Sequence, residues 1–445
     1  MLCRSMKQME RLANSDKQKI NKIHEKQLIG IENNPKMFCL ACSNMMLRGD
    51  GKSNIYQQDC FNIDEKIIKQ FKPTVGLLNP PYSKQKKDYR ELSFIENCLN
   101  MLEPQGICVA IIPQSCVMNT DKTNLILKNR ILGSHTLKAV MSMPDTLFED
   151  SDKNAITCIL VFVAHRPHNS NIKTWFGYWK EDGFIKVRPY GRIDYYNKFK
   201  DKIRNLWVNS YFAQKEIPGF SVLKGVTGND EWLVEPYLKT KFENITDEYF
   251  ENTLKEYSTF LFYNKLSDRV TSEQYNKKHL KLDFTKWKYV KVSDLFDVVG
   301  SKTTDKKILD EQYSKSKVYP YLSTQATNNG VRGFYEIFTD EGNILTIDSA
   351  TIGYCTYQPL NFSASDHVEK LQPKFILNVY RGLFLSTIIN MEQYRYSYGR
   401  KFNQDRINET KIKLPFKKNA VDWLYIENYI KGLRYSKYIN LRKKG

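Results

Sequence analysis

The sequence lacks long apolar runs, and none approaches the about 18 consecutive residues that a membrane-spanning helix needs. The first 27 residues have a polar, helical pattern without the apolar middle of a secretory signal peptide. No internal repeat with a period of about 20 to 50 residues is visible, which argues against a solenoid. These absences predict a globular protein that stays in the cytoplasm and makes no membrane contact.

Metal-binding patterns are also sparse. Nine cysteines are scattered along the chain, and the pair Cys39 and Cys42 has no second CxxC or histidine pair to complete a zinc site. The surrounding residues 35–49 have the pattern of a helix, whose buried face is expected to carry both cysteines. We therefore expect free thiols, as in a reducing compartment, and no metal.

Acidic residues are outnumbered. The chain has 68 Lys and Arg against 49 Asp and Glu, which gives a net charge of +19 and a pI near 9.3. Such a surplus attracts polyanions and is typical of proteins that bind nucleic acid. A generally basic proteome gives the same balance, so the charge favours a nucleic-acid partner without identifying one.

Apolar and amphipathic stretches alternate over residues 27–163, which predicts a parallel sheet flanked by helices in a doubly wound α/β fold. From Trp287 onward, short β segments separated by Gly and Asn turns predict a second, β-rich domain with a helix at 381–393. The strands expected in the first part cover residues 27–32, 54–59, 74–79 and 106–113, with a final pair at 136–144 and 155–164. The helices expected there cover residues 35–49, 64–71, 91–104 and 124–133.

The most informative motif is Asn79-Pro80-Pro81-Tyr82, which ends the apolar strand that begins at Thr74. The carboxyl end of a strand is where open α/β sheets bind ligands. Proline fixes φ and removes a backbone donor, so the carbonyl groups of Asn79 and Pro80 are expected to face a ligand. The Asn79 side chain and one carbonyl would accept both hydrogens of an exocyclic amino group. Tyr82 offers an aromatic face to a base rotated out of its helix.

These acceptors suit methyl transfer to the N6 amine of adenine, whose lone pair is delocalised into the ring. Accepting both amino hydrogens favours a pyramidal nitrogen that can attack a methyl group held in line with it. Positioning and electrostatics would carry such a reaction without a metal or a covalent intermediate. The alternative is a plain turn, because Asn-Pro and Pro-Pro are common in loops. The position after a buried strand argues against that alternative.

Two acids precede the motif at the ends of earlier strands. Glu32 ends the first expected strand, where an acid commonly binds both hydroxyl groups of a ribose. Asp59 ends the second, where a carboxylate can accept from an adenine amino group. With Asn79 they are expected to line one edge of the sheet. Either acid alone is better explained as a helix cap or a solvated loop charge, but the three residues together favour a binding site.

The runs LIGIENNPKMFCLACSNMMLRGDGKSNIYQQDCF and VGLLNPPYS resemble the modification subunit of type I restriction-modification systems and related fused type II enzymes. The likeness continues through KTWFGYWKEDGF and DEWLVEPYLKT and covers about residues 1–285. It implies a DNA adenine-N6 methyltransferase that uses S-adenosyl-L-methionine. By resemblance, the target adenine is held by Asn79, Pro80 and Tyr82, with Pro81 in the same loop. The cofactor is held by Glu32 and Asp59, with Cys60 and Asn79 beside it.

The runs WKYVKVSDLFDVVGS, YLSTQATNNGVRGFY and YSYGRKFNQDRINETKIKLP resemble a target-recognition domain of type I specificity subunits, which implies that the chain reads one half of a double-stranded DNA site. Asn and Arg side chains can read base edges and lysines can hold phosphates. Alternatively, TNNG is only a turn and SYGRK a solvated charge cluster. The candidate DNA contacts are Lys302, Thr327, Asn328, Asn329, Arg332, Tyr398, Arg400 and Lys401.

The resemblance divides the chain into four expected segments. They are a methyltransferase domain at 1–200, a helical extension at 201–285, a target-recognition domain at 286–418, and a spacer or dimerisation helix at 419–445. The family has a strand and a glycine-rich turn that wrap the methionine part of the cofactor, and nothing in residues 1–26 resembles them. Met1 is therefore interpreted as an internal start or as the far side of a broken gene, and the strand of Glu32 is expected to lack its usual neighbour.

No Asp…Glu-x-Lys cluster of a metal-dependent nuclease is evident, because the DEK at 64–66 lies in an expected helix and lacks an upstream partner. Three hypotheses follow. The first is an adenine methyltransferase with built-in recognition, acting alone, with a second copy, or with specificity or restriction subunits. The second is a catalytically inactive remnant that binds DNA in a sequence-specific manner. The third is methyl transfer to an amine or amide of RNA or protein, against which the long recognition domain argues.

Overall fold

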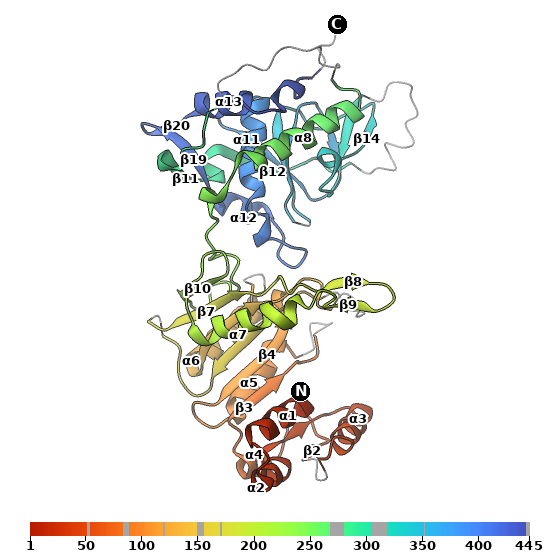
Figure 1. Cartoon of the computed structure of the whole chain (residues 1–445), viewed down its shortest axis with the longest axis vertical. Coiled ribbons are helices and arrows are strands. Elements are labelled where there is room, and N and C mark those ends of the chain that lie inside the picture. Colours follow the sequence, from red (N-terminus) through yellow and green to blue (C-terminus); the bar gives the residue numbers. More distant parts are fainter. Residues whose placement is uncertain are drawn as a thin grey trace. The chain divides into compact units, whose positions relative to one another are not determined.

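The chain forms two compact units, Met1–Leu238 and Lys239–Gly445, in a computed structural model (Figure 1). The structure describes residues 1–50, 54–82, 89–118, 121–148, 155–169, 171–267, 280–304, 318–350 and 352–441. Within these ranges, no helix combines the length and the apolar character needed to cross a membrane.

The first unit is built around a six-stranded sheet of order β10-β7-β5-β6-β4-β3. Strands β3, β4, β5 and β7 run parallel to one another, whereas β6 and β10 are antiparallel to their neighbours. The carboxyl ends of four strands therefore meet at one edge of the sheet, which we call the carboxyl edge. The strands are β3 (Val75–Leu78), β4 (Ile107–Pro113), β5 (Thr136–Ser142), β6 (Thr157–Val163), β7 (Lys173–Tyr178) and β10 (Ser221–Gly225).

The other elements of this unit are helical, apart from two small strand pairs. The helices are α1 (Leu2–Leu12), α2 (Lys17–Lys22), η1 (Ile23–Gln27), α3 (Pro35–Met46), α4 (Glu65–Phe71), α5 (Glu91–Met101), η2 (Gln114–Cys116), α6 (Lys122–Ser134), η3 (Phe199–Ile203) and α7 (Arg204–Ala213). The strand pairs are β1 (Gly30–Ile31) with β2 (Ile55–Tyr56), and β8 (Ile185–Val187) with β9 (Gly191–Ile193).

The sequence pattern places most of this sheet correctly. The expected pair of strands at 136–144 and 155–164 is present as β5 and β6, which are apolar and buried on both faces. Helix α5 packs closely on β3, because a side chain at Gly76 would collide with the Cys98 sulfur. The sheet does not end at β6, however. Trp175 on β7 packs with Trp179 and Trp207 in a core that the aromatic-rich sequence did not reveal.

The N-terminal strands are not part of the six-stranded sheet. Among the described residues, β1 pairs in parallel with β2 alone, and β3 pairs with β4 alone. The strand before Glu32 therefore belongs to a two-stranded sheet that is separate from the six-stranded one. The side chains of Val75 and Leu77 on the outer strand β3 are 58% and 44% exposed.

The N-terminal part of the chain has a small core, and the prediction that both cysteines of helix α3 are buried fails there. Helix α3 is present, but Cys39 is exposed and Cys42 is only partly buried, so the expected buried cysteine face is wrong. Met37 and Leu40 are exposed on the same helix. Only a small core, which includes Met6 and Met45, lies beneath this part of the chain, and it is too small to cover the whole apolar surface of α3.

The described residues of the second unit combine small sheets with the longer helices α8, α11 and α13. The sheet orders are β11-β19-β20, β12-β18-β15-β16 and β14-β13-β17. The strands are β11 (Trp287–Lys291), β12 (Phe296–Gly300), β13 (Tyr319–Leu322), β14 (Val331–Tyr335), β15 (Ile344–Asp348), β16 (Cys355–Gln358), β17 (Ser363–Ala364), β18 (Val368–Pro373), β19 (Lys411–Lys417) and β20 (Ala420–Val421). The helices are η4 (Phe242–Asn244), α8 (Asp247–Tyr263), η5 (Phe284–Lys286), α9 (Val292–Leu295), η6 (Asn328–Gly330), α11 (Val379–Asn390), η7 (Gln393–Arg395), α12 (Gln404–Glu409), α13 (Trp423–Lys431) and η8 (Ser436–Tyr438).

Helices α8, α11 and α13 share one core in this unit. Phe250 of α8 stacks on Phe384 of α11 at 4.9 Å and meets Tyr429 of α13 edge-on at 5.1 Å. The Tyr429 hydroxyl donates to Asp247 at 2.6 Å.

The expected segment boundaries differ from the two observed units. The expected helical extension at 201–285 is divided, because α7 belongs to the first unit and α8 to the second. The expected C-terminal spacer contributes α13 to the core, while residues 268–279 and 442–445 lie outside the described residues.

A buried ionic cluster closes the carboxyl edge of the six-stranded sheet. Ser142 ends β5, and its hydroxyl donates to the Glu235 carboxylate at 2.7 Å. The Lys180 ammonium lies 3.4 Å from Glu235 and 2.8 Å from Asp145. Because Glu235 is fully buried, its charge must be compensated by these partners. The cluster fixes the segment that contains Glu235 onto the sheet.

We predict that Glu235→Gln lowers the free energy of unfolding by about 2 kcal/mol, because it removes the buried carboxylate while Asp145 still pairs with Lys180. Urea denaturation followed by tryptophan fluorescence measures the change. Glu65→Gln is the matched control, since its pair with Lys69 lies at the surface and contributes little to stability. Equal destabilisation by the two variants would contradict the assignment.

Candidate functional site

The Asn79-Pro80-Pro81-Tyr82 loop leaves the sheet at the carboxyl edge, directly after β3. The strand ladder stops at Leu78 because the two prolines that follow Asn79 have no backbone N–H to donate. Asn79 and Pro81 are exposed, Pro80 is buried, and Tyr82 is partly buried. The Asn79 side chain is therefore accessible at the edge of the sheet, as the sequence pattern predicts.

Tyr82 is held with its hydroxyl end inside the protein. Burial raises its pKa to about 12, and the neighbouring Cys116, Cys158 and Glu91 add to the shift. Both Glu91, at the start of α5, and Cys116, after β4, are buried. The phenol therefore stays protonated at neutral pH, and its position is fixed by groups from the sheet and from α5.

Glu32 and Asp59 lie at the carboxyl ends of β1 and β2, each with an oxygen bonded to nearby backbone. Glu32 Oε1 accepts from the Asn34 N–H at 2.8 Å, and Asp59 Oδ1 accepts from the Phe61 N–H at 3.0 Å. These are the local bonds that a capping or loop role predicts. Because β1 and β2 form a separate sheet, the expectation that both acids share a sheet edge with Asn79 is wrong.

Aromatic packing, rather than strand pairing, connects the segment that contains Asp59 to the six-stranded sheet. Phe61 stacks on Tyr89 at 4.2 Å and meets Phe94 of α5 edge-on at 4.8 Å. The Cys60 carbonyl accepts from Asn97 Nδ2 at 2.8 Å. Burial, with the Asp59 charge beside it, raises the pKa of the Cys60 thiol. Phe61 was not among the predicted site residues, although an aromatic residue just after the acid that follows a strand is a usable signal.

The TNNG segment between β13 and β14 is a structured turn. Asn328 and Asn329 have left-handed backbones with φ of 51° and 54°, which Asn tolerates better than most residues. Asn328 Nδ2 donates to the Val331 carbonyl at 2.7 Å, and Asn329 Nδ2 donates to the Tyr357 carbonyl at 2.9 Å. Both amides thus hold the turn, which supports the simpler reading of this motif. Thr327 is exposed at its start.

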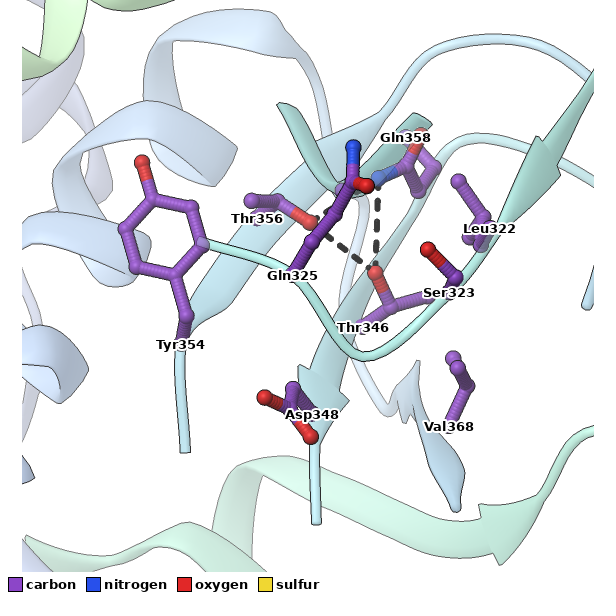
Figure 2. A pocket seen from close by; sticks show the side chains of 10 residues that line it. Leu322, Ser323, Gln325, Thr346, Asp348, Tyr354, Thr356, Gln358 and Val368 are labelled. Carbon is purple, nitrogen blue, oxygen red and sulfur yellow. Dashed lines mark hydrogen bonds between the residues drawn. The ribbon is translucent and has the colours of Figure 1, made fainter. Parts of the chain in front are cut away.

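A buried polar network lies beneath the turn (Figure 2). Gln358 of β16 is fully buried, and its Nε2 donates to the Asn329 carbonyl and to Thr356 Oγ1, both at 2.9 Å. Thr346 of β15 completes the network through a 3.0 Å contact with Thr356. The adjoining cavity of about 10 Å³ has room for about one water molecule. The hydrogen-bond network therefore supports the turn, and the cavity is too small for a nucleotide base.

The remaining candidates lie on other loops of the second unit. Ser397 and Arg400 exchange backbone hydrogen bonds of 3.0 Å in a tight turn, which carries Tyr398, 71% exposed. Arg400 itself is buried, donates to the Arg395 carbonyl at 3.0 Å and lies over the Tyr396 ring. The predicted contact of Arg400 with DNA does not fit this position, because its guanidinium is buried and bonded within the loop. Lys302 and Arg332 are exposed, and Lys401 lies 5.7 Å from the Tyr398 ring.

Two family descriptions match the chain. Residues 1–233 match the N-6 DNA methylase family, and residues 285–441 match the type I restriction modification DNA specificity domain. The first match covers just over half of the chain and contains the Asn79 loop with both strand-end acids.

Relatives of both parts are found in Heyndrickxia coagulans. The type II restriction enzyme and methyltransferase RM.BcgI is 31% identical over 246 residues, which are 54% of this chain and 38% of RM.BcgI. The specificity subunit S.BcgI is 30% identical over 144 residues, which are 31% of this chain and 41% of S.BcgI. The chain thus spans less than half the length of these two relatives.

Among solved structures, a modification subunit of a putative type I restriction enzyme from Vibrio vulnificus is similar with a TM-score of 0.40. It is 14% identical, and the match covers 52% of this chain and 53% of that subunit. The family matches carry the assignment: this chain belongs to the N-6 DNA methylase family, and a type I restriction modification DNA specificity domain follows its methylase region.

Proposed function

We propose that this chain is a site-specific DNA methyltransferase of a restriction-modification system, which methylates N6 of adenine at sites chosen by its second unit. The observation that carries the proposal is the placement of Asn79-Pro80-Pro81-Tyr82. The loop stands at the carboxyl edge, with Asn79 accessible, in a chain of the N-6 DNA methylase family.

In this proposal, the residues of the loop divide the work of holding adenine. The Asn79 side-chain oxygen and the Pro80 carbonyl accept the two amino hydrogens, which favours a pyramidal N6 with an available lone pair. Tyr82 stacks on the base that has left the double helix, and its buried hydroxyl end keeps the ring in place. Catalysis then depends on position and on preorganised acceptors.

The donor set also fits S-adenosyl-L-methionine. Carboxylates at strand ends suit ribose hydroxyls and an adenine amino group, which assigns these partners to Glu32 and Asp59. Cys60 adjoins Asp59, and Phe61 supplies an aromatic surface next to it. When bound there, S-adenosyl-L-methionine would supply an activated methyl group for transfer to the N6 amine that Asn79 and Pro80 hold.

Double-stranded DNA is the proposed substrate. The matched specificity domain and the net charge of +19 support a DNA partner. One recognition domain suits one half of a site, so a second copy or a separate specificity subunit would read the other half. A catalytically inactive DNA-binding remnant is not favoured, because the matched family and the relative RM.BcgI are methyltransferases by description.

We predict that Asn79→Ala abolishes methyl transfer, with a loss of at least about a hundredfold in rate, because one of two acceptors for the amine is removed. Transfer of labelled methyl groups from S-adenosylmethionine to unmodified DNA measures the rate. Asn44→Ala is the control, since Asn44 is exposed on α3 and has no assigned contact with adenine or cofactor. DNA affinity should be unchanged in Asn79→Ala; an equal loss of DNA binding and activity would show that Asn79 is structural.

We predict that substitution of two basic residues of the second unit affects different properties, stability in one case and DNA affinity in the other. Arg400→Met lowers the free energy of unfolding by about 2 to 3 kcal/mol, because it removes a buried charged donor from the loop. Lys302→Gln leaves stability unchanged and weakens DNA binding, with the salt slope of the affinity reduced by about one. Thermal unfolding and fluorescence anisotropy of labelled DNA separate the two effects. A stable Arg400→Met variant with weak DNA binding would reverse the assignment.

A further inference from the structure

A β-hairpin of the first unit begins at the carboxyl edge of its six-stranded sheet. Strand β7 ends at Tyr178, and the chain then forms β8 and β9, which among the described residues pair with each other alone (Figure 1). Because β7 runs parallel to β3, this hairpin starts from the same edge as the Asn79 loop. It contributes nothing to the six-stranded sheet, so its sequence is not explained by the packing of that sheet.

The base of the hairpin is held firmly. The Arg192 guanidinium donates to both oxygens of Asp182 at 2.9 Å, and Asp182 is buried. Gly183 has a φ of +75°, and a side chain there would press against Lys198, so the hairpin and the following segment pack closely. Phe184 meets Phe199 edge-on at 5.5 Å. These contacts fix the direction in which the hairpin extends.

The outer surface of the hairpin and the segment after it is strongly basic. Two nearby acids are already engaged, because Asp182 pairs with Arg192 and both oxygens of Asp194 accept backbone N–H groups. Glu181 and Asp201 are the other acids between residues 181 and 204. Tyr190 is 76% exposed at the tip. The exposed basic residues are Lys186, Arg188, Lys198, Lys200, Lys202 and Arg204.

We infer that residues 185–204 bind the phosphate backbone of double-stranded DNA, separately from the specificity domain. This inference rests on the proposed function, because it needs DNA at the carboxyl edge, where residues 79–82, the proposed adenine loop, are located. Arginine and lysine contacts to phosphates carry no sequence information but fix the position of a duplex. The hairpin therefore holds the DNA beside the adenine loop while the second unit selects the sequence.

The test compares two variants of the full chain that lose the same charge. Arg188→Gln with Lys200→Gln alters the hairpin region. Lys173→Gln with Lys224→Gln alters two exposed lysines at the opposite edge, where β7 begins beside the end of β10. Affinity for a short duplex of unrelated sequence is measured by fluorescence anisotropy over a range of salt concentrations, without cofactor. Thermal unfolding checks that both variants are folded.

The hairpin variant should lose about tenfold to a hundredfold in affinity at about 0.1 M salt, with its salt slope reduced by about two, while the control stays near the wild type. Equal losses in both variants would overturn the inference, because only net charge would then matter. It would also be overturned if the hairpin variant bound duplex DNA normally but lost affinity for anionic vesicles or single-stranded RNA. The readout needs no methyl transfer, so it remains decisive even if the wild-type chain transfers no label.

Discussion

The parallel alignment of β3, β4, β5 and β7 is the constraint on which the organisation of the first unit depends. Parallel strands place their carboxyl ends together, so segments that are distant in sequence start from one edge. The Asn79-Pro80-Pro81-Tyr82 loop follows β3, the buried cluster of Ser142, Lys180 and Glu235 closes the ends of β5 and β7, and the basic hairpin extends beyond β7. A change in strand direction would separate all three.

The second unit solves a different problem, which is to hold exposed turns rigidly on small sheets. Its loops are supported from beneath by buried polar groups, such as the Gln358 side chain, whose Nε2 donates to the Asn329 carbonyl and to Thr356. Arg400 plays a similar part beneath Tyr398. Several residues whose chemistry suits base recognition therefore serve the scaffold, while the accessible positions beside them, such as Thr327 and Tyr398, are left for a partner.

The sequence predicted the strands β3 to β6 and the loop after β3 because apolar periodicity and proline act locally. It did not reveal β7 and β10, whose burial depends on tryptophans that meet only in the folded sheet. The exposure of Cys39 could not be deduced from helical periodicity, because periodicity shows which residues share a face but not what covers that face. The same limit applies to Arg400, since a basic residue in a turn can point outward or inward.

The outer edge of β3 has a consequence for the behaviour of the chain in solution. Among the described residues β3 pairs with β4 alone, so its outer side, where Val75 and Leu77 are exposed, resembles the strand edges that promote intermolecular β-pairing. Like charges on copies that each carry +19 oppose this association at low ionic strength. Added salt screens that repulsion as it weakens attraction to phosphates. Colloidal stability and affinity for polyanions therefore decline together as ionic strength rises.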